Sequence, residues 1–89
     1  MANIAQQKKR NRRSLKQHER NLRYRSTIKT LFRRADDAAA RDDREALEAR
    51  SRELESLIDR AAAKGVIHRN SAARKKSRIA RLVQRVPTP

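Results

Sequence analysis

The chain has 89 residues, of which 25 are Lys or Arg and ten are Asp or Glu, giving a formal net charge of +15. One Gly and two Pro are too few for a fold of many short strands, and the lack of Cys excludes disulfides and thiolate metal sites. A positive excess of this size opposes the compact state of an isolated chain and favours a polyanionic partner. The sequence has no Gly-rich phosphate loop and no nucleophile–base set, so we expect no enzyme, no metal site and no cofactor.

A long first helix is predicted from about residue 7 to 40, with two unlike halves. In its C-terminal half, apolar residues recur at helical spacing and form a core-facing stripe: Tyr24, Ile28, Leu31, Ala35 and Ala38, with Phe32 alongside. In its N-terminal half, basic residues follow one face instead: Lys9, Arg13, Lys16, Arg20 and Arg23. Residues 1–34 carry twelve basic side chains and one acidic side chain. We therefore predict that residues 7–23 form a basic arm without a protein core to pack on, partly unfolded in the free protein.

A second helix is predicted to begin near Asp42 or Asp43. The run from Asp42 to Glu45 supplies an N-cap candidate with a Glu three places on, and its negative charge suits the positive end of the helix dipole. Apolar residues line one face of this helix: Leu47, Leu54, Leu57, Ile58 and Ala61. Gly65 follows where a left-handed residue closes a helix, and Val66 can fold back on the last turn. Residues 35–63 carry five basic and nine acidic side chains, so this middle segment is expected to face solvent.

A third helix is predicted from about His68 or Asn70 to Val86, stopped by Pro87. Its apolar stripe is Ala72, Ile79, Leu82, Val83 and Val86, and its opposite face carries Arg74, Arg78, Arg81 and Arg85. Three helices with short connections bury such stripes most simply as a bundle. We predict an all-α fold in one domain, residues 1–89. It comprises the basic arm 7–23, a three-helix bundle 24–86 and a short frayed tail 87–89. Because of the arm, the first helix is expected to protrude from the bundle.

Two segments resemble the bacterial small-subunit ribosomal protein S-twenty family. They are Met1-Ala2-Asn3-Ile4 followed by Lys8-Lys9-Arg10, and Ala63-Lys64-Gly65-Val66-Ile67-His68-Arg69-Asn70-Ser71-Ala72-Ala73-Arg74-Lys75. The resemblance covers nearly the whole chain in length, charge order and helix placement. It implies a cytoplasmic protein of the small ribosomal subunit, with small-subunit rRNA and neighbouring small-subunit proteins as partners. It also implies that the first helix inserts into the rRNA and that the protein stabilises folded RNA as a primary assembly protein.

The chain departs from the family pattern at one place. Relatives often have a Gly-Asp pair between the first two helices, whereas this chain has Arg41-Asp42. The departure leaves the end of the first helix open by about one turn, without affecting the expected fold.

The residues expected to contact RNA lie on the arm, before the third helix and on that helix. They are Lys8, Lys9, Arg10, Arg12, Arg13, Lys16, Arg20, Arg23, His68, Arg69, Asn70, Arg74, Lys75, Lys76, Arg78, Arg81 and Arg85. Phosphate contact is favoured over a solvated face on the arm, where Glu19 is the only acidic neighbour, although on the third helix Arg stems can also cover apolar surface. The residues alone favour a capping or turn role for His68 and Asn70, and the resemblance adds RNA contact. Tyr24 could stack on a base, but its place on the apolar stripe favours core packing.

Other function classes fit the sequence less well. A basic zipper fails because Leu47 and Leu54 are followed by Ala61 and Gly65 instead of further heptads. No apolar run approaches the roughly 20 residues that span a bilayer, and the basic half of the first helix has little apolar surface, so no membrane partner is expected. No homo-oligomer is expected either. A general architectural DNA-binding protein remains the alternative, because electrostatics alone does not distinguish between polyanions.

Overall fold

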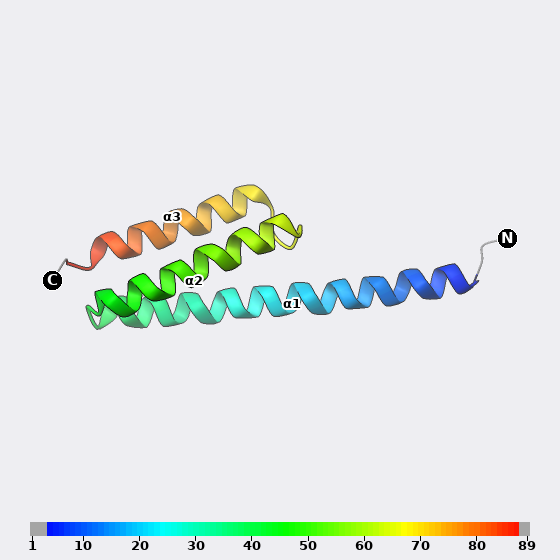
Figure 1. Cartoon of the computed structure of the whole chain (residues 1–89), viewed down its shortest axis with the longest axis horizontal. Coiled ribbons are helices and arrows are strands. Elements are labelled where there is room, and N and C mark those ends of the chain that lie inside the picture. Colours follow the sequence, from blue (N-terminus) through cyan, green and yellow to red (C-terminus); the bar gives the residue numbers. More distant parts are fainter. Residues whose placement is uncertain (1–3, 88–89) are drawn as a thin grey trace.

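The computed structural model describes residues 4–87 and contains three α-helices joined by two short turns (Figure 1). Helix α1 spans Ile4–Ala40, α2 spans Arg44–Ala63 and α3 spans Arg69–Arg85. No β-strand occurs within residues 4–87, so the predicted all-α fold with a long first helix is confirmed. Met1, Ala2 and Asn3 of the first resembling segment, and Thr88 and Pro89 of the predicted tail, lie outside the described residues.

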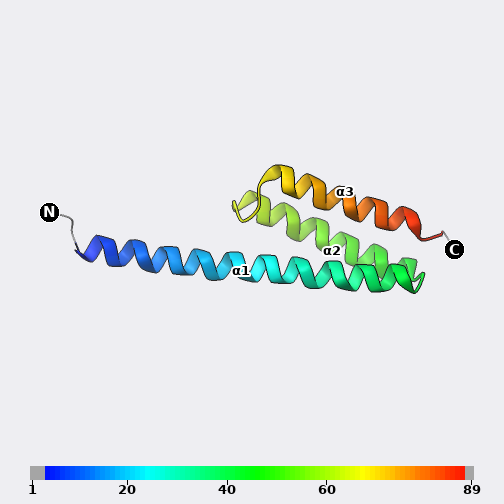
Figure 2. The same cartoon turned by 180° about the vertical axis from the view of Figure 1, so that it is seen from behind.

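The three helices form an elongated molecule measuring 67 × 20 × 14 Å. Helix α2 runs back along the C-terminal half of α1, and α3 runs antiparallel to α2 (Figures 1 and 2). Helix α2 packs extensively on both neighbours, whereas α1 and α3 meet over a smaller area. The N-terminal part of α1 extends past the ends of the other two helices. The helix begins three residues before the predicted position and ends at the predicted Ala40, so the Arg41-Asp42 departure does not shift its end.

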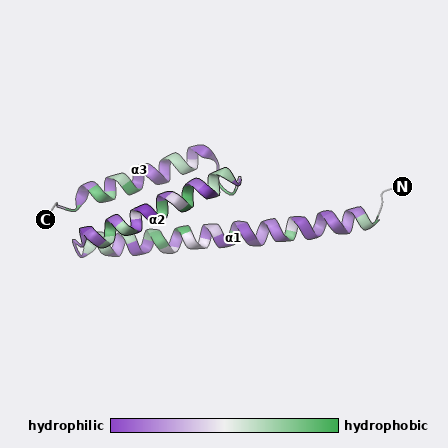
Figure 3. Cartoon of the chain, in the orientation of Figure 1, coloured by the Kyte–Doolittle hydropathy of each residue, from purple (hydrophilic) through white to green (hydrophobic). Residues whose placement is uncertain are grey.

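One hydrophobic cluster joins the three helices and contains the predicted stripes. Its buried members are Ile28, Leu31, Phe32, Ala35, Ala38, Leu47, Leu54, Ile58, Ala61, Val66, Ala72, Ile79, Leu82 and Val86. Tyr24, Leu57 and Val83 are partly buried against it, which confirms core packing for Tyr24. Before Tyr24 the apolar residues of α1 are exposed: Ile4 by 67%, Leu15 by 62% and Leu22 by 48%. Figure 3 shows this part of α1 as predominantly hydrophilic.

The turn between α1 and α2 depends on Asp42 in a left-handed conformation, with φ of 53°. The Asp42 N–H donates to the Ala39 carbonyl at 3.1 Å and the Asp43 N–H donates to the Ala38 carbonyl at 2.9 Å, which satisfies carbonyls at the end of α1. Asp43 then caps α2 by accepting a hydrogen bond from the Ala46 N–H at 3.1 Å. Ala46 occupies the position three places after this cap, so the predicted arrangement with a Glu at that position is wrong.

Asp42 occupies a conformation that Gly adopts with less steric cost. We expect Asp42→Gly to raise the free energy of unfolding by about 0.5 kcal/mol, and Asp42→Ala to lower it by about 1 kcal/mol. Urea unfolding followed by circular dichroism measures both changes. Equal midpoints for the original chain and the two variants would contradict the role of this backbone conformation.

The turn between α2 and α3 is closed by Gly65 with φ of 74°, as predicted. Its N–H donates to the Ala62 carbonyl at 3.1 Å, and the Val66 N–H donates to the Ala61 carbonyl at 2.9 Å. Val66 folds back into the core with 3% exposure. His68 caps α3, because its Nδ1 accepts a hydrogen bond from the Asn70 N–H at 3.1 Å. The capping role predicted for His68 is therefore confirmed, while Asn70 lies inside α3 and is not its cap.

Two arginines donate hydrogen bonds to backbone carbonyls of other segments across the bundle. Arg44, at the start of α2, donates from Nη1 to the Val86 carbonyl at 2.6 Å and to the Val83 carbonyl at 3.5 Å, at the end of α3. Arg25 of α1 donates from Nη2 to the Val66 carbonyl at 3.3 Å. Arg44 thus places positive charge beside carbonyls at the C-terminal end of α3, where the helix dipole is negative, whereas Arg25 holds the α2–α3 turn against α1.

The two halves of α1 differ in their tertiary support, and amide exchange should report the difference. Residues 28–38 include the buried stripe, whereas side chains from residue 4 to residue 19 are exposed. In the free protein we expect fast exchange through residues 8–22 and slow exchange through residues 28–38, because opening the arm breaks few packing contacts. Strong protection of residues 8–22 without nucleic acid would contradict this prediction.

Candidate nucleic-acid interface

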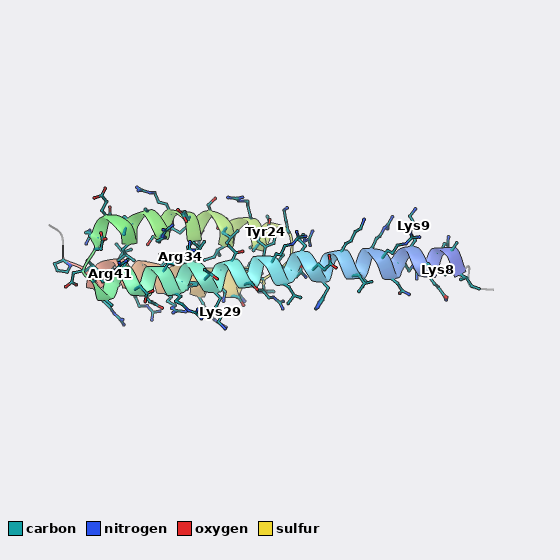
Figure 4. All side chains as sticks on the ribbon, turned by 90° about the horizontal axis from the view of Figure 1, so that it is seen from below. Lys8, Lys9, Tyr24, Lys29, Arg34 and Arg41 are labelled. Carbon is teal, nitrogen blue, oxygen red and sulfur yellow. The ribbon has the colours of Figure 1, made fainter. Side chains whose placement is uncertain are left out.

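The N-terminal half of α1 is an exposed, strongly basic rod. The side chains concerned are Lys8, Lys9, Arg10, Arg12, Arg13, Lys16 and, nearer the bundle, Arg23. Within residues 4–87 none of them has an ion-pair partner. Figure 4 shows Lys8 and Lys9 at the far end of α1, beyond the bundle. These cations contribute nothing to the hydrophobic core and are available to an anion.

Arg20 differs from the rest of the predicted arm stripe. It is half-buried and donates from Nη2 to the Lys64 carbonyl at 3.4 Å and to Asn21 Oδ1 at 3.5 Å. Its Nε is buried without a hydrogen-bond partner. Arg20 thus lies at the negative C-terminal end of α2. The sequence pattern, in contrast, groups it with the freely exposed cations of the arm.

The turn between α2 and α3 places a second group of predicted contact residues beside the base of the arm. His68, Arg69 and Asn70 are exposed there. The hydrogen bonds from Arg20 to Lys64 and from Arg25 to Val66 join this turn to α1. The fold therefore brings the inner end of the arm and residues 68–70 together, although they are more than 40 positions apart in sequence.

The basic residues of α3 point in several directions. Arg74, Arg81 and Arg85 are exposed, while Lys75 and Lys76 are half-buried. Lys76 Nζ lies 2.7 Å from Asp59 Oδ1 of α2, and the hydrogen bond to this carboxylate raises the pKa of Lys76 above its ordinary value of 10.5. Lys76 therefore stays charged at neutral pH while being directed toward α2.

Arg78 of α3 is directed toward α1. Its Nη2 donates to Asp36 Oδ2 at 3.1 Å, and its guanidinium carbon lies 4.4 Å from the centre of the Phe32 ring. An ion pair and a cation–π contact thus hold the guanidinium over α1. Its side chain nevertheless remains 59% exposed.

A basic hollow of about 510 Å³ lies between α1 and α3. Its lining is Arg25, Ile28, Lys29, Phe32, Arg33, Asp36, Ile67, Lys75 and Arg78. Arg25, Lys29 and Arg33 are not among the residues predicted to contact RNA, although they recur every four residues beside the apolar stripe. In Figure 4, Lys29 lies on the side of α1 opposite to Tyr24, which is directed toward α2.

A smaller hollow of about 340 Å³ lies between α1 and α2, lined by Arg20, Arg23, Tyr24, Thr27, Leu57, Arg60 and Lys64. Lys64 Nζ is 5.6 Å from the centre of the Tyr24 ring.

The residues predicted to contact RNA do not gather into one patch. They extend from the free end of α1, past the α2–α3 turn and along α3.

The chain is similar to known proteins over nearly its whole length. The family model described as ribosomal protein S20 matches residues 2–84. The small ribosomal subunit protein bS20 of Nocardioides sp. is 43% identical over 81 residues, which cover 91% of this chain and 94% of that protein. The chain belongs to the ribosomal protein S20 family. Proteins of the same name from Coprothermobacter proteolyticus and Nitrosomonas eutropha are 45% and 43% identical, covering 92% and 94% of this chain and 93% and 97% of theirs.

Membership of the ribosomal protein S20 family confirms the resemblance stated from the sequence. The resembling segment from Ala63 to Lys75 forms the end of α2, the turn at Gly65 and the start of α3. The family comprises structural proteins of the small ribosomal subunit and not enzymes, which confirms the predictions of a non-enzymatic protein and a ribosomal location.

Two further observations apply to the described part of the chain. Within residues 4–87, no group of three or more His, Asp or Glu side chains is arranged to hold a metal ion. No helix there is both long and apolar enough to cross a membrane.

Proposed function

We propose that this chain binds and stabilises folded small-subunit rRNA, and that it acts as a primary assembly protein. The observation that carries the proposal is the arm, because its basic side chains have neither a core nor ion-pair partners in the described structure. An RNA backbone supplies both a counter-charge and a surface along which such a helix can lie. The proposed contacts are the residues predicted from the sequence.

We further propose that the chain works as one domain with two parts. The bundle, residues 24–86, fixes the position of α3 and of the turn that carries His68. The arm, residues 7–23, gains its tertiary contacts from RNA. Arg20 lies where the parts meet, and its contact with Lys64 supports a fixed direction for the base of the arm. Neighbouring small-subunit proteins are proposed as additional partners.

A competition experiment tests the choice of polyanion. The labelled protein is bound to protein-free small-subunit rRNA at fixed salt, and unlabelled rRNA or duplex DNA of equal phosphate concentration is added. We expect the rRNA to compete much more strongly. Equal competition would favour the alternative, a general architectural DNA-binding protein, because nonspecific phosphate contact is shared by both polymers.

The proposed place in assembly has its own test. A primary binder attaches to rRNA before other ribosomal proteins are present, so binding to the protein-free transcript should be saturable. It should also persist through a high-salt wash of assembled small subunits. Binding that occurs only after other small-subunit proteins are added would contradict the primary role while leaving rRNA binding intact.

A further inference from the structure

The hollow between α1 and α3 combines an apolar floor with a cationic rim. The floor contains Ile28 and Phe32, which are buried, and Ile67, which is half-buried. Among the rim cations, Lys29, Arg33 and Lys75 have no hydrogen-bond or ion-pair partner within residues 4–87. A volume of about 510 Å³ falls within the range of about 300–1,000 Å³ that is usual for small-ligand sites. An apolar floor beside unpaired cations suits a ligand that has both a flat apolar part and an anionic part.

Arg78 supplies a flat surface at the edge of this hollow. Its guanidinium carbon lies over the Phe32 ring, 4.4 Å from the ring centre, and its Nη2 donates to Asp36 Oδ2 at 3.1 Å. The Arg78 side chain is 59% exposed, so much of it remains accessible to a ligand. Guanidinium planes and aromatic rings are the surfaces on which unpaired RNA bases stack.

The charges that line the hollow favour an anionic ligand. Asp36 is the one acidic side chain in the lining, and Arg78 pairs with it. The cations Lys29, Arg33 and Lys75 then remain to meet a phosphate. Arg25 lies at the same hollow but donates to the Val66 carbonyl.

We propose that this hollow receives one unpaired nucleotide of the bound RNA, with its base stacked on the exposed face of Arg78 and its phosphate beside Lys29, Arg33 and Lys75. The site rests on the proposed rRNA-binding function and adds to it a contact with a base. Phe32 and Asp36 act as positioning residues, because they orient the Arg78 guanidinium. The other cationic surfaces contact phosphates, whereas this site responds to the presence of a base.

The base contact is tested with two single-stranded RNA probes of eight nucleotides at constant salt: oligoadenylate and an abasic oligomer with the same number of phosphates. Arg78→Lys keeps the charge and removes the planar stacking surface. We expect this variant to bind oligoadenylate at least about fivefold more weakly, with unchanged affinity for the abasic oligomer. Arg52→Lys, an exposed substitution on α2, is the matched control and should leave both affinities unchanged. Circular dichroism checks that each variant is folded.

The phosphate contact is tested by a pair of variants with equal net charge. Lys29→Gln combined with Arg33→Gln removes two rim cations, and Arg34→Gln combined with Arg41→Gln removes two cations that lie outside the hollow. Figure 4 shows Lys29 and Arg34 at separate positions on α1 and Arg41 just beyond the end of that helix. We expect the first pair to weaken oligoadenylate binding by about tenfold or more at 0.1 M salt and the second pair by much less.

Methyl resonances locate the bound probe directly. Oligoadenylate should shift the methyl signals of Ile28 and Ile67, which line the floor, and the abasic oligomer should leave them largely unchanged. Equal weakening of both probes by Arg78→Lys, or unshifted methyl signals under saturating oligoadenylate, would overturn the nucleotide site. An acidic peptide that shifts the same methyl signals more strongly would also overturn it. If one of these results is found and the unsubstituted chain still binds rRNA, the proposed function stands without the nucleotide site. If the unsubstituted chain does not bind rRNA, both the proposed function and the nucleotide site are overturned.

Discussion

Replacing Lys9, Arg13 and Lys16 with Gln is expected to weaken binding to small-subunit rRNA by about 50- to 200-fold at 0.15 M salt. Each phosphate contact makes the logarithm of affinity fall more steeply with the logarithm of salt concentration, by about 0.7 to 0.9, which corresponds to a factor of about 4 to 6 in affinity per contact at this salt concentration. Loss of three contacts should therefore make this negative slope shallower by about 2 to 3. Filter binding or fluorescence anisotropy across a salt series measures both quantities.

The control is the triple variant Arg41→Gln, Arg50→Gln and Arg52→Gln, which has the same net charge. These residues lie at the α1–α2 turn and on α2, in the segment where acidic residues outnumber basic ones. We expect a loss of less than about fivefold, because screening limits the effect of charges more than about 8 Å from the RNA at physiological salt. Equal losses for the two triple variants would show that net charge alone determines affinity and would contradict a specific role for the arm.

Leu54→Ala is expected to lower the free energy of unfolding by about 2–5 kcal/mol. Leu54 is 0% exposed and lies in the middle of α2, the helix that packs on both others, so the truncation leaves a cavity in the shared core. A domain of this size has a total stability of only about 5–13 kcal/mol at typical values per residue, and the net charge of +15 lowers it further. We therefore expect a large fraction of the free variant to be unfolded at 37 °C.

Leu15→Ala is the matched control, since it removes the same atoms from a side chain that is 62% exposed. Its effect on the unfolding of the bundle should be within about 0.5 kcal/mol. Thermal unfolding followed by circular dichroism compares the two variants. An excess of rRNA should restore the helical signal of Leu54→Ala, because a ligand present at 1,000 times its Kd stabilises the folded state by about 4 kcal/mol. Similar unfolding of the two variants would contradict the contrast between the buried core around Leu54 and the unpacked arm that carries Leu15.

The helices and the core were predictable because they depend on local patterns. The spacing of Ile28, Leu31 and Ala35 determines which face of α1 is apolar, and burial follows wherever a partner helix lies. Gly65 marks the end of α2 because a left-handed residue is needed there. The end of α1 has no such marker, since Asp42 adopts the left-handed conformation without being Gly. The sequence nevertheless predicted an end near residue 40, to within about one turn, and α1 ends at Ala40.

The roles of individual arginines were not predictable from periodicity. Arg20, Arg25 and Arg44 donate to carbonyls 41 to 44 positions away, and these contacts depend on how the helices are rotated and offset relative to one another. A charge pattern indicates which face of a helix is basic, but not which cation meets the end of another helix. The hollow between α1 and α3 was missed for the same reason, because its lining comes from both helices and the turn before α3.

The exposed arm also has a consequence for the lifetime of copies that have not joined a ribosome. From Lys8 to Lys16 it offers a series of Lys and Arg side chains on a helix without tertiary support, and local opening of such a segment costs little. Trypsin-like proteases cleave after these residues once the backbone opens. A partner lying along the arm would cover the same bonds. Surplus protein therefore contains a protease-sensitive segment, and incorporation into the ribosome would protect that segment from cleavage.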